Sequence, residues 1–322
     1  AMLDAIVIGA GWAGLAAADV LKQAGMQVLV VEKSRGPGGR SATRREGRVR
    51  FDHGAQYFTA RGGAFARRLQ HWKDAGWVEP WRPRLAVLGG GEEHGNPEEI
   101  ARFVAVPGMN GVCRRLADSL ECRFGTRIER LEYDRFWRVH TAKGEVLESS
   151  RLLLTAPAPQ AADLLGAEDP LSGALRQIRF DPCLAGMVSF SAPIEVEFDA
   201  AFVNLDLPLA WVARNSSKPG RENQSWVLHA TPAWSRQHLE KDSDTFAAEL
   251  LAAFAELVPA ALPEPRSLLG HRWRYALATN PREDGLIADA DRRLVIAGDW
   301  LSGNRIEGAW TSGRKAGRWL AE

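Results

Sequence analysis

The feature that most constrains this chain is a glycine motif directly after its first predicted strand. Residues 4–8 form a short β-branched run typical of a buried parallel strand. Gly9, Gly11 and Gly14 follow in the spacing G-x-G-x-x-G, and residues 15–24 have the Ala, Leu and Lys content of a helix. Strand, glycines and helix in this order predict the first half of a nucleotide-binding βαβ unit.

Each glycine has a physical role in such a unit. The first allows a tight turn, the second lets backbone approach a pyrophosphate, and the third lets the helix pack close to the strand. The pyrophosphate lies at the helix N-terminus, where free N–H groups and the helix dipole favour anions. A second strand, 27–31, ends at Glu32, whose carboxylate is placed to accept hydrogen bonds from ribose hydroxyls. The motif alone does not separate NAD from FAD.

Two further segments favour FAD. The stretch 35–40 is rich in glycine, and Arg40 offers a fork of donors to phosphate. A predicted strand over 293–299 ends at Asp299, which is placed to bond the ribityl or diphosphate end of FAD. A terminal helix predicted to start near Ile306 aims its N–H groups at the flavin N1/O2 edge, where reduced flavin is negative. The arginines at 44, 45, 48 and 50 are interpreted as a basic surface loop.

Composition narrows the class of protein. The length of 322 residues suits one large domain or two modest ones, and a net charge of +1 gives no global attraction to nucleic acid or to an anionic membrane. The three cysteines show no CxxC spacing, so we expect no disulfide framework, no metal site and a cytoplasmic location. No apolar run is long enough to span a membrane, and the apolar N-terminus merges into the glycine motif rather than forming a signal peptide.

The predicted elements describe an α/β fold with two domains. A Rossmann-type FAD-binding domain is predicted from residues 2–60, 100–165 and 266–322, and a second, α+β substrate domain from 61–99 and 166–265. The second domain is predicted to contain a helix around Trp72, strands at 184–191, 209–214 and 225–230, and a helix over 244–257 with Ser243 as a possible N-cap. We expect its mixed sheet to roof the flavin, in a plan that resembles p-hydroxybenzoate hydroxylase.

The chain resembles the FAD-dependent amine-oxidase superfamily and, within it, the bacterial branch of the renalases. The residues that carry the resemblance are 52–61, 107–110 and 298–313, and the match is loose through 193–265. The resemblance implies that Arg40 lies near the flavin diphosphate and that the backbone of Ile128 meets adenine. It also implies non-covalent FAD, because residues 298–313 contain neither cysteine nor histidine.

The resemblance further implies an activity. The chain's resemblance to bacterial renalases implies an oxidase that converts 1,2-dihydro and sometimes 1,6-dihydro isomers of NAD(P)H to NAD(P)+. The electrons pass to O2, giving hydrogen peroxide. Hydride transfer from a dihydropyridine to flavin N5 needs stacking and orientation more than acid–base help, so no catalytic side chain is assigned. The expected partners are a dinucleotide substrate and O2, for a monomer or homodimer.

The candidate site residues fall into two groups. Those expected at FAD are Gly9, Gly11, Trp12, Ala13, Gly14, Glu32, Lys33, Arg40, Gln56, Tyr57, Ile128, Asp299 and Ile306. Those expected at the substrate are Tyr57, Phe58, Thr59, Ala60, Arg61, Asn96, Trp211, Arg214, Trp234 and His238. His53 is expected to be structural and near the diphosphate.

Two alternatives remain open from the sequence. The first is a flavin amine oxidase or desaturase acting on a small amine or apolar substrate, with Trp273 and Tyr275 contributing to an aromatic cage. The second belongs to another class, a non-catalytic FAD- or NAD-binding sensor that does not turn over with oxygen.

Overall fold

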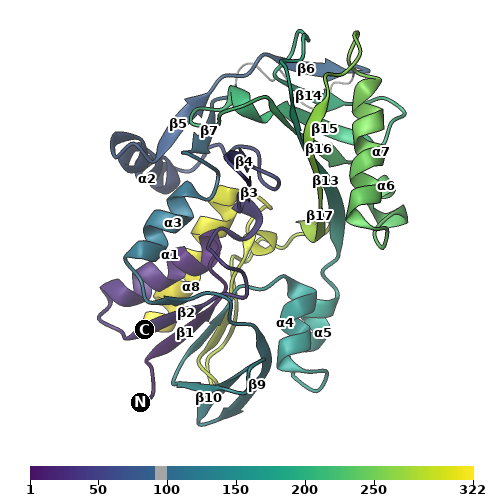
Figure 1. Cartoon of the computed structure of the whole chain (residues 1–322). Coiled ribbons are helices and arrows are strands. Elements are labelled where there is room, and N and C mark those ends of the chain that lie inside the picture. The colour runs from purple at the N-terminus through teal and green to yellow at the C-terminus, as the bar shows by residue number, and fades with distance from the viewer. Residues whose placement is uncertain (91–99) are drawn as a thin grey trace.

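A computed structural model describes residues 1–90 and 100–322. Figure 1 shows two layered units, one above the other, with the N- and C-termini both in the lower one. The helices are α1 (Trp12–Gln23), α2 (Gly63–Asp74), α3 (Gly111–Asp118), α4 (Ala158–Leu165), α5 (Ser172–Arg176), α6 (Pro232–Gln237), α7 (Ser243–Ala255) and α8 (Ile306–Ala321), with 3₁₀ turns η1 (Gly39–Ser41), η2 (Asn215–Ser217) and η3 (Asp299–Leu301). Within the described part of the chain, no helix combines the length and the apolar character that crossing a membrane requires.

The strands belong to two large sheets and three small ones. They are β1 (Ala5–Ile8), β2 (Val28–Val31), β3 (Arg44–Glu46), β4 (Val49–Phe51), β5 (Val78–Trp81), β6 (Leu85–Leu88), β7 (Arg102–Ala105), β8 (Cys122–Arg123), β9 (Ile128–Asp134), β10 (Phe136–Thr141), β11 (Val146–Ser149), β12 (Leu152–Leu154), β13 (Phe180–Phe190), β14 (Ala200–Val203), β15 (Leu209–Arg214), β16 (Ser225–Ala230), β17 (Pro265–Ala278), β18 (Ile287–Asp289) and β19 (Leu294–Ile296).

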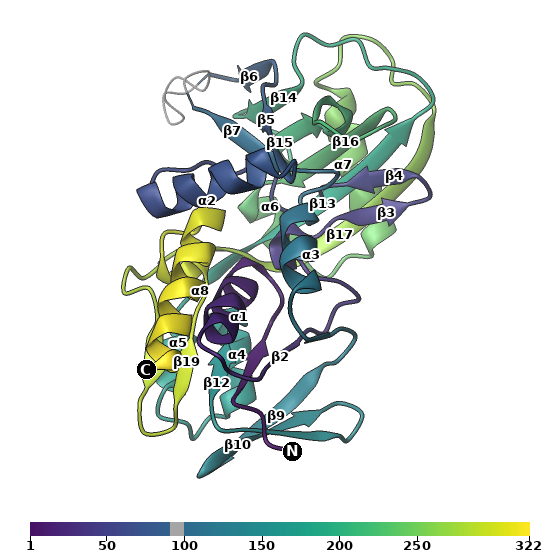
Figure 2. The same ribbon diagram turned by 90° about the vertical axis from the view of Figure 1, so that its left-hand side faces the viewer.

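The lower unit is a Rossmann-type layer, as predicted from the glycine motif. Its sheet has the order β18-β19-β12-β1-β2-β8, parallel except for β18. Every residue of β1 and β2 is buried because both faces of the sheet are covered. Helices α1 and α8 lie side by side on one face (Figure 2), where a Cβ added at Gly313 would lie 2.1 Å from the Ala13 carbonyl oxygen. The three-stranded sheet β11-β10-β9 lies below it.

The upper unit is a mixed six-stranded sheet in the order β17-β13-β16-β15-β14-β6, with β6 and β14 parallel. Helices α6 and α7 cover its outer face in Figure 1, and Phe246, Leu250 and Phe254 of α7 are fully buried there. This arrangement confirms the predicted second layer, and β15 and β16 have the predicted bounds. Strand β17 pairs with β13 from Pro265 to Ala278, so the second layer continues beyond the boundary expected at residue 265.

Two local features differ from the sequence prediction. The N-cap of α7 is Asp242, whose carboxylate accepts a hydrogen bond from the Thr245 N–H at 3.2 Å, so the cap lies one residue before Ser243. Helix α2 is formed as predicted, but it lies against the lower unit because Phe65 and Trp72 pack on Trp12 (Figure 2). Segment 61–90 therefore serves both units, since β6 pairs with β14 of the upper sheet.

Candidate functional site

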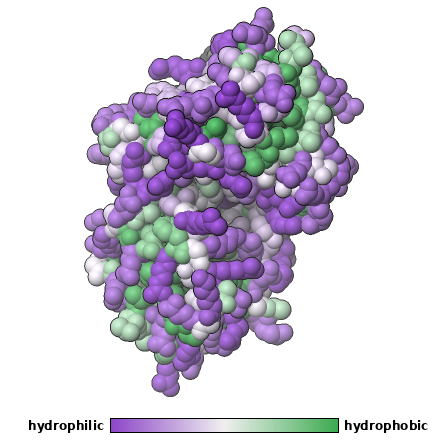
Figure 3. All heavy atoms as spheres, in the orientation of Figure 1, coloured by the Kyte–Doolittle hydropathy of each residue, from purple (hydrophilic) through white to green (hydrophobic). Residues whose placement is uncertain are grey.

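A large cavity lies between the two units in the described part of the chain. It has a volume of about 2570 Å³ and is lined by the glycine motif below and by β17 above. Figure 3 shows a hollow on this face, with hydrophilic side chains on both sides of it. Pockets for drug-sized ligands measure about 300–1,000 Å³, so this cavity has room for a dinucleotide and a second molecule.

The floor of the cavity is a glycine cradle. Gly9 has a left-handed φ of 108°, and a Cβ added at Gly14 would lie 1.9 Å from the Gly9 carbonyl oxygen. At Gly11 an added Cβ would meet the Gly39 backbone only at 3.7 Å, so the two glycine loops face each other. Gly11 is also the N-cap of α1 and provides no side-chain cap, which leaves the N–H groups of the first turn available to an anion.

Glu32 lies at the end of β2 and lines the same cavity. One carboxylate oxygen accepts a hydrogen bond from the Ala10 N–H at 2.8 Å, and the other accepts from the Ser34 N–H at 3.0 Å. A carboxylate has about four acceptor positions, so Glu32 retains capacity for two more donors. This geometry fits the predicted contact with ribose hydroxyls.

Arg40 and Asp299 form an ion pair with each other. The Arg40 guanidinium also donates to the Ala276 carbonyl at 2.9 Å, which ties the loop after β2 to β17. Both side chains line the cavity. The pair fixes the loop at the C-terminal end of β19 beside the glycine cradle.

Helix α8 begins at Ile306, as predicted, and its N-terminus faces the cavity. Its N-cap, Arg305, makes no side-chain cap, so the first-turn N–H groups are available to a polar ligand edge. Glu307 accepts hydrogen bonds from the backbone N–H groups of Arg61 and Gly62, at 3.0 and 2.5 Å. The helix start therefore holds the end of the segment 56–61.

An aromatic wall of His53, His271 and Trp273 lines the upper side of the cavity. The His53 ring lies 4.5 Å from the His271 ring and 4.9 Å from the Trp273 ring, centroid to centroid. The His53 carbonyl accepts from Trp273 Nε1 at 3.0 Å and pairs with His229 Nε2 at 2.9 Å. His53 Nδ1 is buried with no hydrogen-bond partner in the described residues.

The histidines of this wall are neutral at neutral pH. Burial lowers the pKa of His53 to about 3, with the neighbouring His271 adding to the effect. Burial and the charge of Arg44 lower the pKa of His271 to about 4, and burial lowers that of His229 to about 4. A neutral imidazole has one donor and one acceptor nitrogen, so the wall can orient a polar flat molecule without adding charge.

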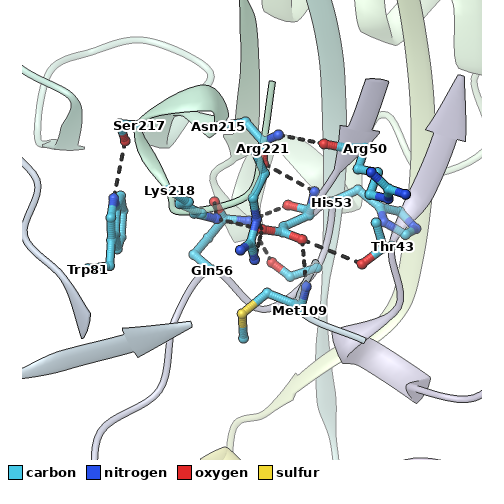
Figure 4. A network of polar contacts seen from close by, with 12 residues as sticks. Thr43, Arg50, His53, Gln56, Trp81, Met109, Asn215, Ser217, Lys218 and Arg221 are labelled. Carbon is cyan, nitrogen blue, oxygen red and sulfur yellow. Dashed lines mark hydrogen bonds and ion pairs between the residues drawn. The ribbon is translucent and has the colours of Figure 1, made fainter. Parts of the chain in front are cut away.

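Next to His53, Asp52 is the centre of a buried ion network with Lys218 and Arg221, and Figure 4 shows these two cations beside His53 and Gln56. One carboxylate oxygen accepts from Arg221 at 2.8 and 3.0 Å and from Lys218 at 3.2 Å. The other accepts from the Met109 N–H at 2.9 Å. All three charged side chains are fully buried.

Burial alone would raise the pKa of Asp52. The charges of Lys218 and Arg221 and the hydrogen bond from Met109 outweigh burial and hold this pKa below its usual value. Burial lowers the pKa of Lys218 to about 8, although Asp52 opposes the shift. The network contains one carboxylate for two cations, and the charge of Arg221 adds to the effect of burial on the pKa of Lys218.

Gln56 extends this network towards the cavity. Its amide nitrogen donates to the Asp52 carbonyl at 2.6 Å, and its amide oxygen accepts from Lys218 and Trp211 at 3.2 and 3.3 Å. With its amide fully occupied, Gln56 does not line the cavity; it holds its neighbour Tyr57, which does.

Most of the predicted site residues meet at the cavity. The residues that line it are Gly9, Gly11, Trp12, Ala13, Gly14, Glu32, Lys33, Arg40, Tyr57, Phe58, Thr59, Arg61, Ile128, Asp299 and Ile306. Gln56 and Ala60 belong to the same segment without lining it, and Asn96 lies outside the described residues.

Four other predicted substrate residues, apart from Ala60, do not line the cavity. Trp234 and His238 stack on each other at 3.9 Å around α6, which covers the outer face of the upper sheet. Arg214 pairs with Asp199 and lies over the Trp226 ring at 4.7 Å. Trp211 is buried behind Tyr57, with the two ring centroids 6.1 Å apart.

Sequence reasoning named Trp273 as part of an aromatic cage, but it missed the two histidines of the wall and the ion network. His53 lines the cavity, with its ring 4.9 Å from the Trp273 ring of β17, and its expected position near the diphosphate stays a prediction. The hydrogen bond between Trp273 and His53 joins residues 220 apart in the chain, and no local pattern marks such a contact. The hairpin β3–β4 does have a sequence signal, the glycine at position 47. Gly47 has a positive φ of 59° in the two-residue turn between the strands, and glycine is favoured in such hairpin turns.

Comparison with known proteins gives a consistent result. Residues 67–318 match the family described as flavin containing amine oxidoreductase, and residues 7–72 match the NAD(P)-binding Rossmann-like domain. A curated relative, the 2-oxo-Δ3-4,5,5-trimethylcyclopentenylacetyl-CoA monooxygenase of Pseudomonas putida, is 30% identical over 167 residues, which is 50% of this chain and 26% of that protein. The chain thus spans about a quarter of the length of this relative.

Solved structures share the whole fold. Cyclohexylamine oxidase from Brevibacterium oxydans IH-35A superposes with a TM-score of 0.76 at 14% identity, covering 100% of this chain and 99% of that one. Putrescine oxidase bound to putrescine gives a TM-score of 0.75 at 12% identity, covering 99% of each chain. Identities this low establish the fold and not the substrate.

Proposed function

The chain belongs to the flavin-containing amine oxidoreductase family, and from this premise we propose that it oxidises misreduced nicotinamide dinucleotides. The proposed substrates are 1,2-dihydro-NAD(P) and, in second place, 1,6-dihydro-NAD(P). Each substrate molecule reacts with one O2 and one proton to give one NAD(P)+ and one hydrogen peroxide. Within the family, this activity corresponds to that of the bacterial renalases.

FAD is the cofactor of this family, and the cavity floor fits it. The cradle at Gly9, Gly11 and Gly14 excludes side chains where a pyrophosphate would approach, and Glu32 retains free acceptor positions. Gly11 and Ile306, at the N-terminal ends of α1 and α8, both line this cavity. When bound, FAD supplies the two-electron acceptor that O2 reoxidises.

The observation that carries the proposal is the charge of the cavity lining. Among the described residues that line it, thirteen are Lys or Arg and six are Asp or Glu, while the whole chain has a net charge of +1. A cleft of one sign focuses its field on ligands of the opposite sign. This lining favours a second molecule that carries phosphates, and it disfavours a protonated amine.

The aromatic wall supports the same substrate. A dihydropyridine ring is flat, and its carboxamide offers both donors and acceptors, which match the neutral rings of His53 and His271 beside Trp273. The substrate needs orientation rather than a strong base. The His53 and His271 rings suit this role because both are uncharged at neutral pH. Tyr57 and Phe58 line the same cavity and add aromatic surface to it.

One observation favours the rival activity, oxidation of a small amine. The rings of Trp273 and Tyr275 both line the cavity and could surround an amine as a cage. Steady-state oxygen consumption distinguishes the two activities. We expect the purified holoenzyme to have a kcat/KM for 1,2-dihydro-NAD far above that for cyclohexylamine or putrescine. Turnover of the amines without turnover of any dihydro isomer would overturn the proposal, and no turnover of either would favour the sensor.

A further inference from the structure

The hairpin β3–β4 presents three arginines to the cavity. Arg44, Arg45 and Arg50 all line it, and Arg45 lies directly opposite Arg50 in the antiparallel register. Side chains opposed in this way have Cβ atoms about 4.5–5.5 Å apart, and like charges there destabilise the pair. Both positions lie in the paired strands and not in the turn, so the turn does not require arginine at either of them.

These arginines make no ion pair with an acidic side chain in the described part of the chain, whereas two other cavity arginines do. Arg40 pairs with Asp299 and Arg274 with Glu240. The buried carboxylate nearest in sequence, Asp52, is already shared by two cations. The hairpin brings one acidic residue, Glu46, to the cavity beside these three arginines, so its contribution to the lining has a net positive charge.

The hairpin is held rigidly on the substrate side of the cavity. Phe51 is fully buried against Met187 and Val227 of the upper sheet, and the Arg50 carbonyl accepts from Asn215 Nδ2 at 2.6 Å (Figure 4). The charge of Arg44 acts on His53 and His271, which places this arginine within electrostatic reach of the wall. The positive charge and the aromatic wall are thus parts of one compartment.

We propose that Arg45 and Arg50, with the charge of Arg44 nearby, form an anion subsite that binds the phosphate groups of the dinucleotide substrate while its nicotinamide ring lies against the wall. This inference rests on the proposed function and specifies which side chains select phosphate-bearing substrates. Arginine forks bind phosphate oxygens in pairs, and an anion between Arg45 and Arg50 turns their repulsion into attraction for a shared ligand.

The first test measures binding without catalysis. Isothermal titration of the FAD-loaded protein with ADP-ribose, which carries the diphosphate but no nicotinamide, is compared for Arg45→Gln, Arg50→Gln and a matched control, Arg48→Gln. Arg48 is an exposed residue in the turn of the same hairpin and does not line the cavity. We expect about tenfold to a hundredfold weaker binding in the first two variants and a change within about twofold in the control.

Two further readouts separate binding from folding. The melting temperature of Arg45→Gln should equal or exceed that of the wild type, because the substitution removes a like-charge opposition. Arg50→Lys keeps the charge without the fork and should restore part of the affinity. Inorganic phosphate should compete with ADP-ribose only weakly, because it reaches one part of the subsite.

The second test uses KM and the limiting rate of flavin reduction with 1,2-dihydro-NAD. We expect Arg45→Gln and Arg50→Gln to raise KM about tenfold or more and to leave the limiting rate within about twofold. Unchanged KM and unchanged ADP-ribose affinity in both variants would refute the subsite and leave the proposed function standing. If 1,2-dihydro-NAD fails to reduce the wild-type flavin, the proposed function fails, and the ADP-ribose series still decides on the subsite.

Discussion

Replacing Asp52 by asparagine removes the negative charge that two buried cations share. The carboxylate accepts two hydrogen bonds from Arg221 at 2.8 and 3.0 Å and one from Lys218 at 3.2 Å, and all three side chains have no exposed surface. Breaking a buried ion pair by removing one partner costs about 3–5 kcal/mol, because the remaining charge stays buried without compensation.

One of the two cations can reduce this free-energy cost by losing its charge. Lys218 has a pKa lowered to about 8 by burial even with Asp52 present, so it can release its proton when the carboxylate is gone. Arg221 cannot, because a guanidinium stays charged in proteins. We therefore expect Asp52→Asn to lower the free energy of unfolding by about 3 kcal/mol or somewhat more. At about 2–4 °C per kcal/mol, the melting temperature should fall by roughly 6–12 °C.

The assay is thermal and urea denaturation at a fixed excess of FAD, because bound cofactor shifts apparent stability. The control is Glu145→Gln, which breaks the exposed ion pair with Arg123 and should cost less than about 1 kcal/mol. Adding Lys218→Met to Asp52→Asn should recover part of the loss, because it removes one uncompensated cation. A loss in Asp52→Asn no larger than in Glu145→Gln would refute the reasoning.

Three other predictions follow from the site. The pKa of Lys218 is about 8 in the folded protein and 10.5 unfolded, so the free energy of unfolding should rise between these pH values, and urea titration of Lys218→Met should lack that rise. His53 and His271 have pKa values of about 3 and about 4 in the folded protein, below the value of 6.5 for an unfolded histidine. The free energy of unfolding should therefore fall as the pH falls from 6.5 to about 4, and it should fall less steeply in His53→Gln. Gly14→Ala places a Cβ 1.9 Å from the Gly9 carbonyl oxygen and should lower FAD content, measured by absorbance after gel filtration. In Gly173→Ala, where an added Cβ meets nothing within 4 Å, FAD content should be unchanged.

The fold was predictable where the signal is local. The glycine spacing, the β-branched strands and the helix start at Ile306 each depend on neighbouring residues, and the structure reproduces them. The bounds of β15 and β16 are also as predicted, because each is a short run that is mostly apolar and nearly all buried. Which sheet a strand joins depends on residues far away in the chain. The sequence therefore assigns β17 to the FAD-binding domain, whereas the strand pairs with β13 of the upper sheet.

The candidate site likewise contains residues that local sequence predicts and residues that it does not. Glu32 and Asp299 lie at strand ends near glycine turns, so sequence spacing alone brings them to the cavity. Trp234 and His238 lie on a helix whose covered face depends on tertiary packing, and the structure places them on the outer side of the sheet. The hairpin arginines were interpreted as a surface loop because their density in sequence does not reveal the cavity that they line.

The central claim is that a flavin in this cationic cavity accepts electrons from a misreduced nicotinamide. Anaerobic titration of the purified holoenzyme with 1,2-dihydro-NAD tests it most directly, with the visible absorbance of oxidised flavin as the readout. The account predicts complete bleaching at one substrate molecule per flavin and formation of an equal amount of NAD+. Persistence of the oxidised spectrum with every dihydro-NAD(P) isomer, together with bleaching by cyclohexylamine or putrescine, would contradict it.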